Sequence, residues 1–272
     1  MYLVAQKLIN QACKIIVIQA ENPDGDSLGS ALALEEILSV LGKEVKLYCP
    51  VEIPKYLRYI DGWDRVENDF STDADLAIIV DTTAELLLSK VLETTGVRHF
   101  LESREVLVID HHTSAEPTLS FNHTLLLDEA AATSQVIYNL AESFHWHINK
   151  QAAKAMLTAL LSDTLGLTTQ NVNSKVYSTA AKLSDLGASP AEIEEKRRDF
   201  MKKSPKILEY KGKLIERIEY FLDGRLAIVH VPWEEIQEYS DEYNPGALIG
   251  DELRLVEGVD INCVITHGTY KI

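Results

Sequence analysis

The stretch that decides the fold is Ile15-Ile16-Val17-Ile18-Gln19-Ala20-Glu21-Asn22-Pro23-Asp24-Gly25-Asp26, in which an apolar run ends in a turn with two carboxylates. Four consecutive β-branched residues are typical of a strand that is buried on both faces of a parallel sheet. After the turn, apolar residues recur at helical spacing from Leu28 to Leu38. The stretch therefore predicts a strand, an acidic turn and a helix, which together begin a strand–helix–strand unit.

Three further short, largely apolar runs are predicted to form strands, at Val45–Tyr48, Leu76–Val80 and Val106–Ile109. Segments of helical periodicity separate them, and later helices are expected over Thr133–Phe144 and Lys150–Leu161. Alternating strands and helices imply right-handed crossovers. We therefore predict an α/β fold built on a doubly wound, mainly parallel sheet.

A change of pattern after residue 186 predicts a second, smaller α/β domain. Gly187 is placed to end a helix, and Ser189-Pro190-Ala191-Glu192 has the pattern of a helix start. The charged residues that follow indicate a solvated connecting helix. We therefore assign residues 1–186 to a large domain, 187–205 to a linker helix and 206–272 to the small domain. The elements expected in the small domain are a helix in at least part of Ile207–Leu222, a turn at Asp223-Gly224, and strands at Leu226–Val231 and Gly258–Ile265.

The composition excludes several classes of protein. A chain of 272 residues with 46% hydrophobic and 25% charged residues is expected to fold as a globular protein. A net charge of −16 argues against binding of long duplex DNA, although a small phosphorylated substrate remains compatible with it. Three scattered cysteines, no signal-like segment and no membrane-spanning run favour a cytoplasmic protein that has no membrane partner.

Acidic and histidine side chains follow the predicted strands. Asp24 and Asp26 follow the first strand, Asp81 the third and Asp110-His111-His112 the fourth, and Asp163 ends a later helix. The carboxyl ends of parallel strands form the edge where open α/β sheets bind ligands. A single aspartate after a strand is most often a helix cap or turn residue, but four clusters favour a metal site. Carboxylates combined with imidazole favour Mn²⁺, with Mg²⁺ as a second candidate.

These clusters resemble the motifs of the DHH superfamily of phosphoesterases over essentially the whole first domain. The motifs that carry the resemblance are Asn22-Pro23-Asp24-Gly25-Asp26-Ser27-Leu28-Gly29-Ser30, Asp81-Thr82-Thr83, Asp110-His111-His112-Thr113 and Ser162-Asp163-Thr164. The chain is most similar to the bacterial branch with a DHH-associated (DHHA1) second domain. That branch contains nanoRNases, phosphatases of 3′-phosphoadenosine 5′-phosphate (pAp) and cyclic di-AMP phosphodiesterases. The resemblance implies a Mn²⁺-dependent hydrolase of short oligoribonucleotides or nucleotides that uses a metal-activated water, and it leaves a homodimer open.

The resemblance also implies a role for each residue of the site. Two Mn²⁺ ions are expected, one held by Asp26, Asp81, His111 and Asp163, and one to which Asp24 and Asp81 contribute. Asp110 is expected to orient the ligand histidine, and His112 to face the substrate phosphate, so these two residues are the catalytic candidates. The segment Ala131-Ala132-Thr133-Ser134 is similar to a small-residue helix start of the family, which we interpret as structural.

The chain departs from the family's pattern at two places. The first motif normally begins with histidine where this chain has Ala20, and its neighbours Gln19 and Glu21 would point to the opposite face of an extended strand. We therefore expect one of the two ions to bind weakly. The family's glycine-rich segment is absent: Thr266-His267-Gly268 reads as a turn and Thr269–Ile272 as the start of a strand, so the small domain is expected to be truncated or divergent. A nucleotide-binding protein with little turnover and an inorganic pyrophosphatase remain as alternatives.

Overall fold

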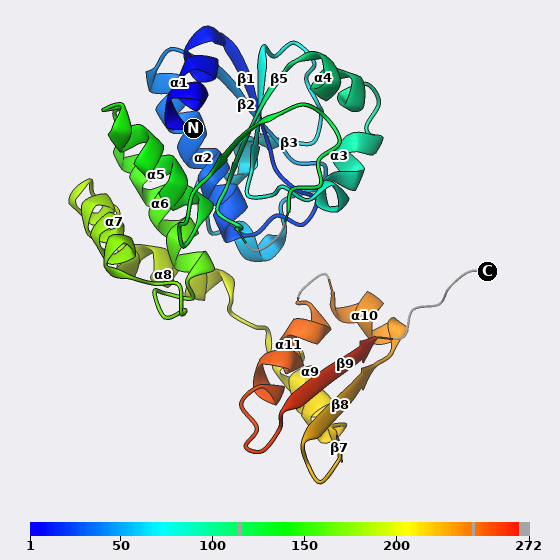
Figure 1. The fold of residues 1–272 in the computed structure, drawn as a ribbon. Coiled ribbons are helices and arrows are strands. Elements are labelled where there is room, and N and C mark those ends of the chain that lie inside the picture. Colours follow the sequence, from blue (N-terminus) through cyan, green and yellow to red (C-terminus); the bar gives the residue numbers. More distant parts are fainter. Residues whose placement is uncertain (114–115, 241–242, 267–272) are drawn as a thin grey trace. The chain divides into compact units, whose positions relative to one another are not determined.

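The computed structural model describes residues 1–113, 116–240 and 243–266 of the chain. The chain divides into two compact units, Met1–Phe200 and Met201–Ile272, each of which has a hydrophobic core of its own (Figure 1). The charged helix α8 (Pro190–Phe200) belongs to the first unit, where Ile193 is buried in the main core. Among the described residues, no helix is both long and apolar enough to cross a membrane.

The first unit is built on a six-stranded sheet in which every neighbouring pair of strands is parallel. Its strands are β1 (Lys14–Ile18), β2 (Glu44–Tyr48), β3 (Val66–Glu67), β4 (Leu76–Val80), β5 (Glu105–Asp110) and β6 (Thr124–Leu127). They lie in the order β3-β2-β1-β4-β5-β6. The direction of winding therefore reverses between β1 and β4, which is the point where doubly wound sheets bind their ligands. The predicted α/β fold with a doubly wound sheet is confirmed.

Helices cover both faces of this sheet (Figure 1). Alternate residues of β1 explain why, since Ile15 and Val17 join one core and Ile16 and Ile18 join the other. One face is covered by α1 (Tyr2–Gln11), α2 (Gly25–Val40), α5 (Thr133–Ser143) and α6 (Lys150–Asp163), and the other by α3 (Ser89–Glu93) and α4 (Val97–Ser103). The remaining helices are α7 (Ser174–Asp185) and the short 3-10 turns η1 (Lys55–Leu57), η2 (Trp63–Arg65) and η3 (Glu85–Leu88).

The second unit has a three-stranded sheet in the order β7-β8-β9, and this confirms the smaller α/β domain. Its elements are α9 (Pro205–Glu216), β7 (Glu219–Phe221), β8 (Leu226–Val231), α10 (Trp233–Tyr239), α11 (Pro245–Leu253) and β9 (Ile261–Thr266). β7 is antiparallel to β8 and β9 is parallel to it. Alternate residues of β8, Ala227, Val229 and Val231, point into the core that the helices cover.

The predicted and observed elements differ in the small unit and at the edges of the large sheet. A helix was expected in at least part of Ile207–Leu222, and α9 provides it as far as Glu216. Glu219–Phe221 instead forms β7, which was not predicted and which pairs with β8 through the Asp223-Gly224 turn. The edge strands β3 and β6 were not predicted, because β3 has only two residues and the apolar run of β6, Leu125–Leu127, is shorter than the runs that predicted the other strands. The strand expected at Thr269–Ile272 lies outside the described residues.

Candidate metal centre

His111 and three aspartates meet at the carboxyl edge of the sheet. The Nε2 atom of His111 lies 3.9 Å from Asp26 Oδ2, 3.7 Å from Asp81 Oδ1 and 3.6 Å from Asp163 Oδ2. The other ring nitrogen, Nδ1, is 3.2 Å from the carbonyl oxygen of Ala130. Because a carbonyl can only accept, the neutral form of the ring would carry its proton on Nδ1, and its Nε2 would then have a lone pair for a cation among the carboxylates.

Asp26 is held in place by the start of helix α5. Its Oδ2 accepts a hydrogen bond from the backbone N–H of Thr133 at 2.6 Å, and its Oδ1 accepts from the N–H of Ser134 at 3.2 Å and from the Ser30 hydroxyl at 3.2 Å. The first N–H groups of a helix have no partner within the helix, so they are suited to an anion. Asp26 is almost completely buried, and these hydrogen bonds hold its carboxylate so that it faces His111.

Asp81 follows β4 in a left-handed backbone conformation, with a φ of +65°. Aspartate tolerates this region better than most residues that have a Cβ. Its N–H still bonds to the Ile109 carbonyl of β5 at 2.9 Å, while its Oδ1 accepts a hydrogen bond from the Thr133 hydroxyl at 2.9 Å. Thr133 thus holds two site carboxylates at once, one through its N–H and one through its hydroxyl.

Asp110 orients a different histidine from the one that we expected. Its Oδ1 accepts hydrogen bonds from the backbone N–H of His111 at 2.7 Å and of His112 at 3.1 Å, and it lies 2.7 Å from the ring Nδ1 of His112. The ring of His111 is instead oriented by Ala130. The hydrogen bond to Asp110 raises the pKa of His112, although partial burial of the ring opposes this. Since the His112 side chain is 53% exposed, its Nε2 is left to meet a ligand.

The other end of the site has fewer ligand atoms. Asp24 is the N-cap of α2, and its Oδ1 accepts hydrogen bonds from the N–H groups of Asp26 at 3.0 Å and Ser27 at 2.9 Å. Ala20 is buried and has no donor atom in its side chain. The carboxylate of Glu21 accepts the N–H of Lys90 at the start of α3, at 2.8 Å, and is thereby engaged. Neither Ala20 nor Glu21 therefore supplies a free side chain that could replace the imidazole of the family's first motif.

The electrostatics of the aspartate cluster are unfavourable for the bare chain. Burial raises the pKa of Asp81 well above its usual value, and the charges of Asp26 and Asp24 add to this. Burial also raises the pKa of Asp26, although His111 opposes the shift. Burial and the charge of Asp26 raise the pKa of Asp163 to about 6. A divalent cation among these groups would offset both the repulsion and the lost hydration.

The donor atoms fit a divalent metal ion. Within the described part of the chain, one ligand atom each from Asp26, His111 and Asp163 lie within 4.8 Å of one another, as do one each from Asp81, Asp110, His111 and His112. The buried Nε2 of His111 has no hydrogen-bond partner among these residues, although it faces three carboxylates. A neutral imidazole and aspartate oxygens form the mixed donor set that transition metals accept.

Two elements of the site were not identified from the sequence. The segment around Thr133 was interpreted as structural, yet it supplies hydrogen bonds to both Asp26 and Asp81. The carbonyl of Ala130 orients His111, and any residue type could supply that carbonyl. The sequence feature that could have identified Thr133 was a Thr-Ser pair at the start of a helix, because the N–H groups of a helix start can bind an anion at the carboxyl edge of the sheet.

Three known proteins of similar sequence have names of enzymes that act on phosphate linkages. The chain is 28% identical to the "Bifunctional oligoribonuclease and PAP phosphatase NrnA" of Thermus thermophilus, over 89% of this chain and 71% of that protein. It is 24% identical to the "Cyclic-di-AMP phosphodiesterase PdeA" of Listeria monocytogenes, over 96% of this chain but only 40% of that protein. It is also 27% identical to the "Probable manganese-dependent inorganic pyrophosphatase" of Enterococcus faecalis, over 64% of this chain and 55% of that protein.

A similar fold occurs in a solved structure, that of an exopolyphosphatase-related protein from Bacteroides fragilis. The TM-score is 0.82 at 22% sequence identity, over 98% of this chain and 80% of that one. The model of the DHH family N-terminal domain matches residues 14–162, which include β1 to β6 and nearly all of α6. Since this match covers more than half of the sequence, the expected hydrolase family is confirmed: the chain belongs to the DHH family of phosphoesterases.

Proposed function

We propose that this protein is a Mn²⁺-dependent phosphoesterase that hydrolyses phosphate esters of short nucleotides. The candidate substrates are oligoribonucleotides of a few residues, pAp, and linear or cyclic dinucleotides. The observation that carries the proposal is the approach of His111 Nε2 to carboxylate oxygens of Asp26, Asp81 and Asp163, at 3.6 to 3.9 Å. The names of the relatives support the same class of reaction.

We assign Asp26, Asp81, His111 and Asp163 as ligands of one ion, and Asp24 with Asp81 as ligands of a second, weaker one. The neutral imidazole in the first set favours Mn²⁺, and Mg²⁺ remains able to bind oxygen ligands. When bound, divalent ions lower the pKa of a water molecule to generate a nucleophile and offset charge that develops on the phosphate.

The residues of the chain contribute orientation and a hydrogen-bond donor. The Ala130 carbonyl fixes the tautomer of His111, and the start of α5 holds Asp26. Asp110 holds His112 through Nδ1 and stabilises its protonated form, so that Nε2 is available to donate to a phosphate oxygen of the substrate. No serine or cysteine nucleophile is needed, because water attacks the phosphorus directly in this scheme.

Two other functions have support of their own. A nucleotide-binding protein with little turnover is supported by Ala20, whose side chain has no atom that could bind a metal ion. Its neighbour Glu21 does not replace one, because its carboxylate already accepts a hydrogen bond from the Lys90 N–H. Similarity to the pyrophosphatase of Enterococcus faecalis supports cleavage of a phosphoanhydride instead of an ester.

The three functions are distinguished by one set of assays with purified protein and Mn²⁺. The linear dinucleotide pApA, pAp, cyclic di-AMP and pyrophosphate are each incubated with the wild type and with Asp110→Ala. We expect hydrolysis of at least one nucleotide and a large loss of rate in the variant. Release of phosphate from pyrophosphate alone would favour the pyrophosphatase. Failure to cleave any of the four, together with no effect of Asp110→Ala on nucleotide binding, would overturn the proposal.

A further inference from the structure

An open cleft of about 630 Å³ in the first unit lies beside the metal centre and is not part of it. Its walls come from the end of α6, the loop that follows it, the start of α8 and the segment after η1. The residues that matter here are Tyr59, Leu161, Ser162, Leu165, Pro190 and Ile193. Most of these side chains are apolar, and the two charged residues on the wall, Glu194 and Arg197, pair with each other at 2.7 Å. The cleft therefore suits an uncharged, partly apolar ligand better than a phosphate.

The cleft and the metal centre share a border in the sequence and in space. Ser162 and Leu165 stand on either side of Asp163, which faces His111. Ser162 also packs closely on the Asp24–Asp26 turn, since a Cβ atom at Gly25 would lie 2.6 Å from Ser162 Cβ. A substrate with its phosphate among the aspartates would thus have its ester substituent next to this cleft.

The backbone after Asp163 is strained at the border. Leu165, Gly166 and Leu167 have φ values of +47°, +74° and +68°, a left-handed run in which two of three residues carry a Cβ. Backbone hydrogen bonds hold the run, from Gly166 N–H to the Leu161 carbonyl at 2.8 Å and from Leu167 N–H to the Thr164 hydroxyl at 3.0 Å. Such conformations persist only where the surrounding structure enforces them, and they concentrate at ligand sites.

The two strained leucines differ in what their side chains do. Leu167 packs on a small core that contains Leu160 and Val176, which accounts for its position. Leu165 is 74% exposed, so that no comparable burial offsets its conformation, and it lies on the wall of the cleft. Leu165 therefore presents an exposed apolar side chain on the cleft wall, two residues from Asp163, where it is available to contact a bound molecule.

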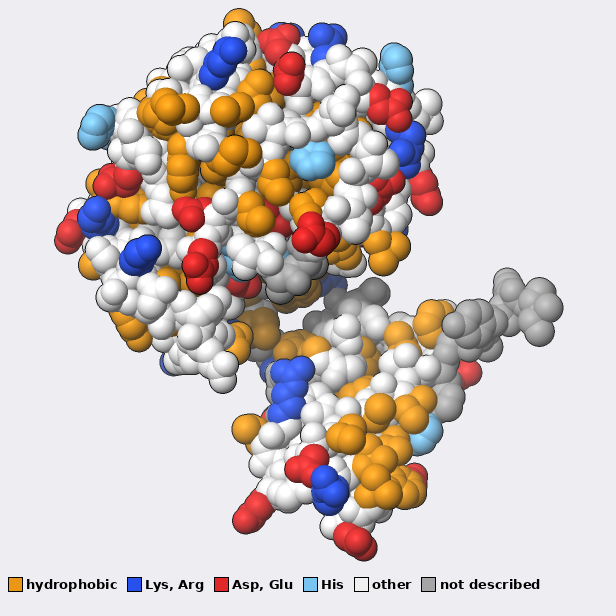
Figure 2. All heavy atoms as spheres, in the orientation of Figure 1, with side chains coloured by type: hydrophobic (Ala, Val, Ile, Leu, Met, Phe, Trp, Pro, Cys, Tyr) orange, Lys and Arg blue, Asp and Glu red, His pale blue; other side chains and the backbone are white. Residues whose placement is uncertain are grey.

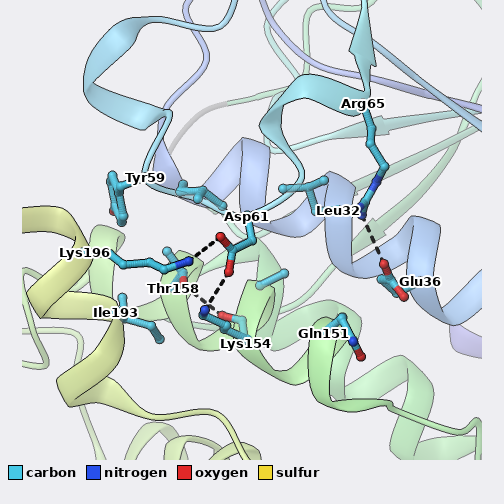
Figure 3. Close-up of a pocket in the computed structure, with 12 residues that line it drawn as sticks. Leu32, Glu36, Tyr59, Asp61, Arg65, Gln151, Lys154, Thr158, Ile193 and Lys196 are labelled. Carbon is cyan, nitrogen blue, oxygen red and sulfur yellow. Dashed lines mark hydrogen bonds and ion pairs between the residues drawn. The ribbon is translucent and has the colours of Figure 1, made fainter. Parts of the chain in front are cut away.

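The neighbouring pocket, which shares Tyr59, Thr158 and Ile193 with this cleft, does not offer an alternative site for the phosphate (Figure 3). Its two lysines, Lys154 and Lys196, both bind the carboxylate of Asp61. An anion entering there would have to displace that carboxylate.

We propose that this cleft binds the sugar and base of the nucleotide whose phosphate lies at the metal centre, with Leu165 as the residue that contacts the nucleoside. The inference rests on the proposed function for the identity of the ligand. Leu165 is a specificity-determining residue in this assignment, because it distinguishes a phosphate that carries a nucleoside from one that does not.

The test measures binding of adenosine 5′-monophosphate and of inorganic phosphate in the presence of Mn²⁺ by calorimetry. The variants are Leu165→Gly and Leu165→Asn, since glycine and asparagine accept a positive φ and should leave the fold intact. Leu222→Gly is the matched control, because Leu222 has a φ of +54° and is 67% exposed in the hairpin of the other unit. Thermal unfolding of each variant checks that the fold is retained.

We expect both Leu165 variants to weaken binding of the nucleotide about tenfold, the effect of losing one leucine contact, and to leave phosphate binding unchanged. The control should change neither. The inference is overturned if the wild type binds the nucleotide no more tightly than phosphate, if the Leu165 variants weaken both ligands equally, or if Leu222→Gly has the same effect. Hydrolysis assays on the same proteins separate the two proposals: nucleotide binding that depends on Leu165 without any turnover supports the cleft and rejects the proposed function.

Discussion

The two ends of the metal centre differ in how many side-chain atoms can bind a metal ion. The inner end consists of Asp26, Asp81, His111 and Asp163, and the outer end of Asp24 and the Ala20 position. At the inner end, His111 Nε2 faces three carboxylates, and the start of α5 and the Ala130 carbonyl hold these groups in place. At the outer end, Asp24 also serves as the cap of α2, and Ala20 offers no ligand atom. An inner site with buried, oriented donors should bind an ion tightly, whereas an outer site with few donors should bind one weakly.

The surroundings of the two ends explain the difference in physical terms. The inner carboxylates are buried, and burial raises their pKa values, so that they gain most from a cation. Asp24 is less buried and its Oδ1 already accepts two backbone hydrogen bonds.

The spheres in Figure 2 show acidic and basic side chains mixed over the visible face of the first unit, so no basic surface there competes with the metal centre for a phosphate.

The largest effect is expected from His111→Ala at the inner end. Removal of a residue that only supports a ligand reduces metal affinity or activity by about 10- to 100-fold, and removal of the ligand itself should exceed about 100-fold. Both Mn²⁺ affinity and turnover should fall by this amount. Asp24→Asn is the paired outer variant, which keeps the helix cap because asparagine also caps helices. An equal loss in the two variants would contradict an uneven site.

A smaller loss is expected from Thr133→Val, which removes the hydroxyl that donates to Asp81 but keeps the N–H that donates to Asp26. Because Thr133 supports the ligand Asp81, we expect Mn²⁺ affinity to fall by about 10- to 100-fold while the fold is retained. Thr94→Val provides the control, since its hydroxyl bonds to the Lys90 carbonyl outside the site. Unchanged affinity in Thr133→Val would show that Asp81 needs no such support.

A gain is expected from Ala20→His, which restores an imidazole at the outer end. Affinity for the second ion should rise, and turnover should rise about tenfold if that ion limits the rate. Ala20→Phe tests the added bulk without a ligand atom, which is necessary because Ala20 is buried. A wild type that is already as active as Ala20→His would contradict the view that the outer end is deficient.

The smallest effect concerns stability outside the metal centre, in the ion pairs of Asp61 with Lys154 and Lys196 (Figure 3). Burial raises the pKa of Asp61, but the two lysines outweigh this and lower it overall. A carboxyl with a lowered pKa adds stability above its unfolded pKa, about 3.9, and this stability is lost as the pH falls through its folded pKa. Asp61→Asn should therefore reduce the free energy of unfolding by about 0.5–1 kcal/mol at pH 7.

The difference between Asp61→Asn and the wild type should shrink as the pH falls below about 3.9, and it should vanish once the pH lies below the folded pKa of Asp61. Urea unfolding at pH 7 and at pH 3 measures it. A difference that does not change with pH would show that packing, rather than charge, is responsible.

The sequence predicted the parts of the fold and the site that depend on local pattern. β1, β2, β4 and β5 lie within a residue of the expected strands, because each is a short, largely apolar run. The acidic residues after β1, β4 and β5 were expected at one edge, because the carboxyl ends of parallel strands lie together. The site has a long-range component that no local pattern contains: Thr133 reaches Asp26 across 107 residues of sequence.

Local pattern also could not predict which histidine ring Asp110 contacts. Its position directly after β5 was predicted, but the choice between His111 and His112 as its partner depends on how two adjacent rings turn at the end of the strand. The carbonyl that orients His111 belongs to Ala130, whose side chain gives no indication of this role.

The central claim is the unevenness of the metal centre, and the number and affinity of bound Mn²⁺ ions test it most directly. Calorimetric titration of the metal-free wild type with Mn²⁺, followed by elemental analysis after dialysis, gives both quantities. We predict one tightly held ion per chain that survives dialysis and a second that binds only at higher Mn²⁺ concentration, with the tight ion lost in His111→Ala. Two ions of equal affinity in the wild type, or a tight ion that persists in His111→Ala, would contradict the account.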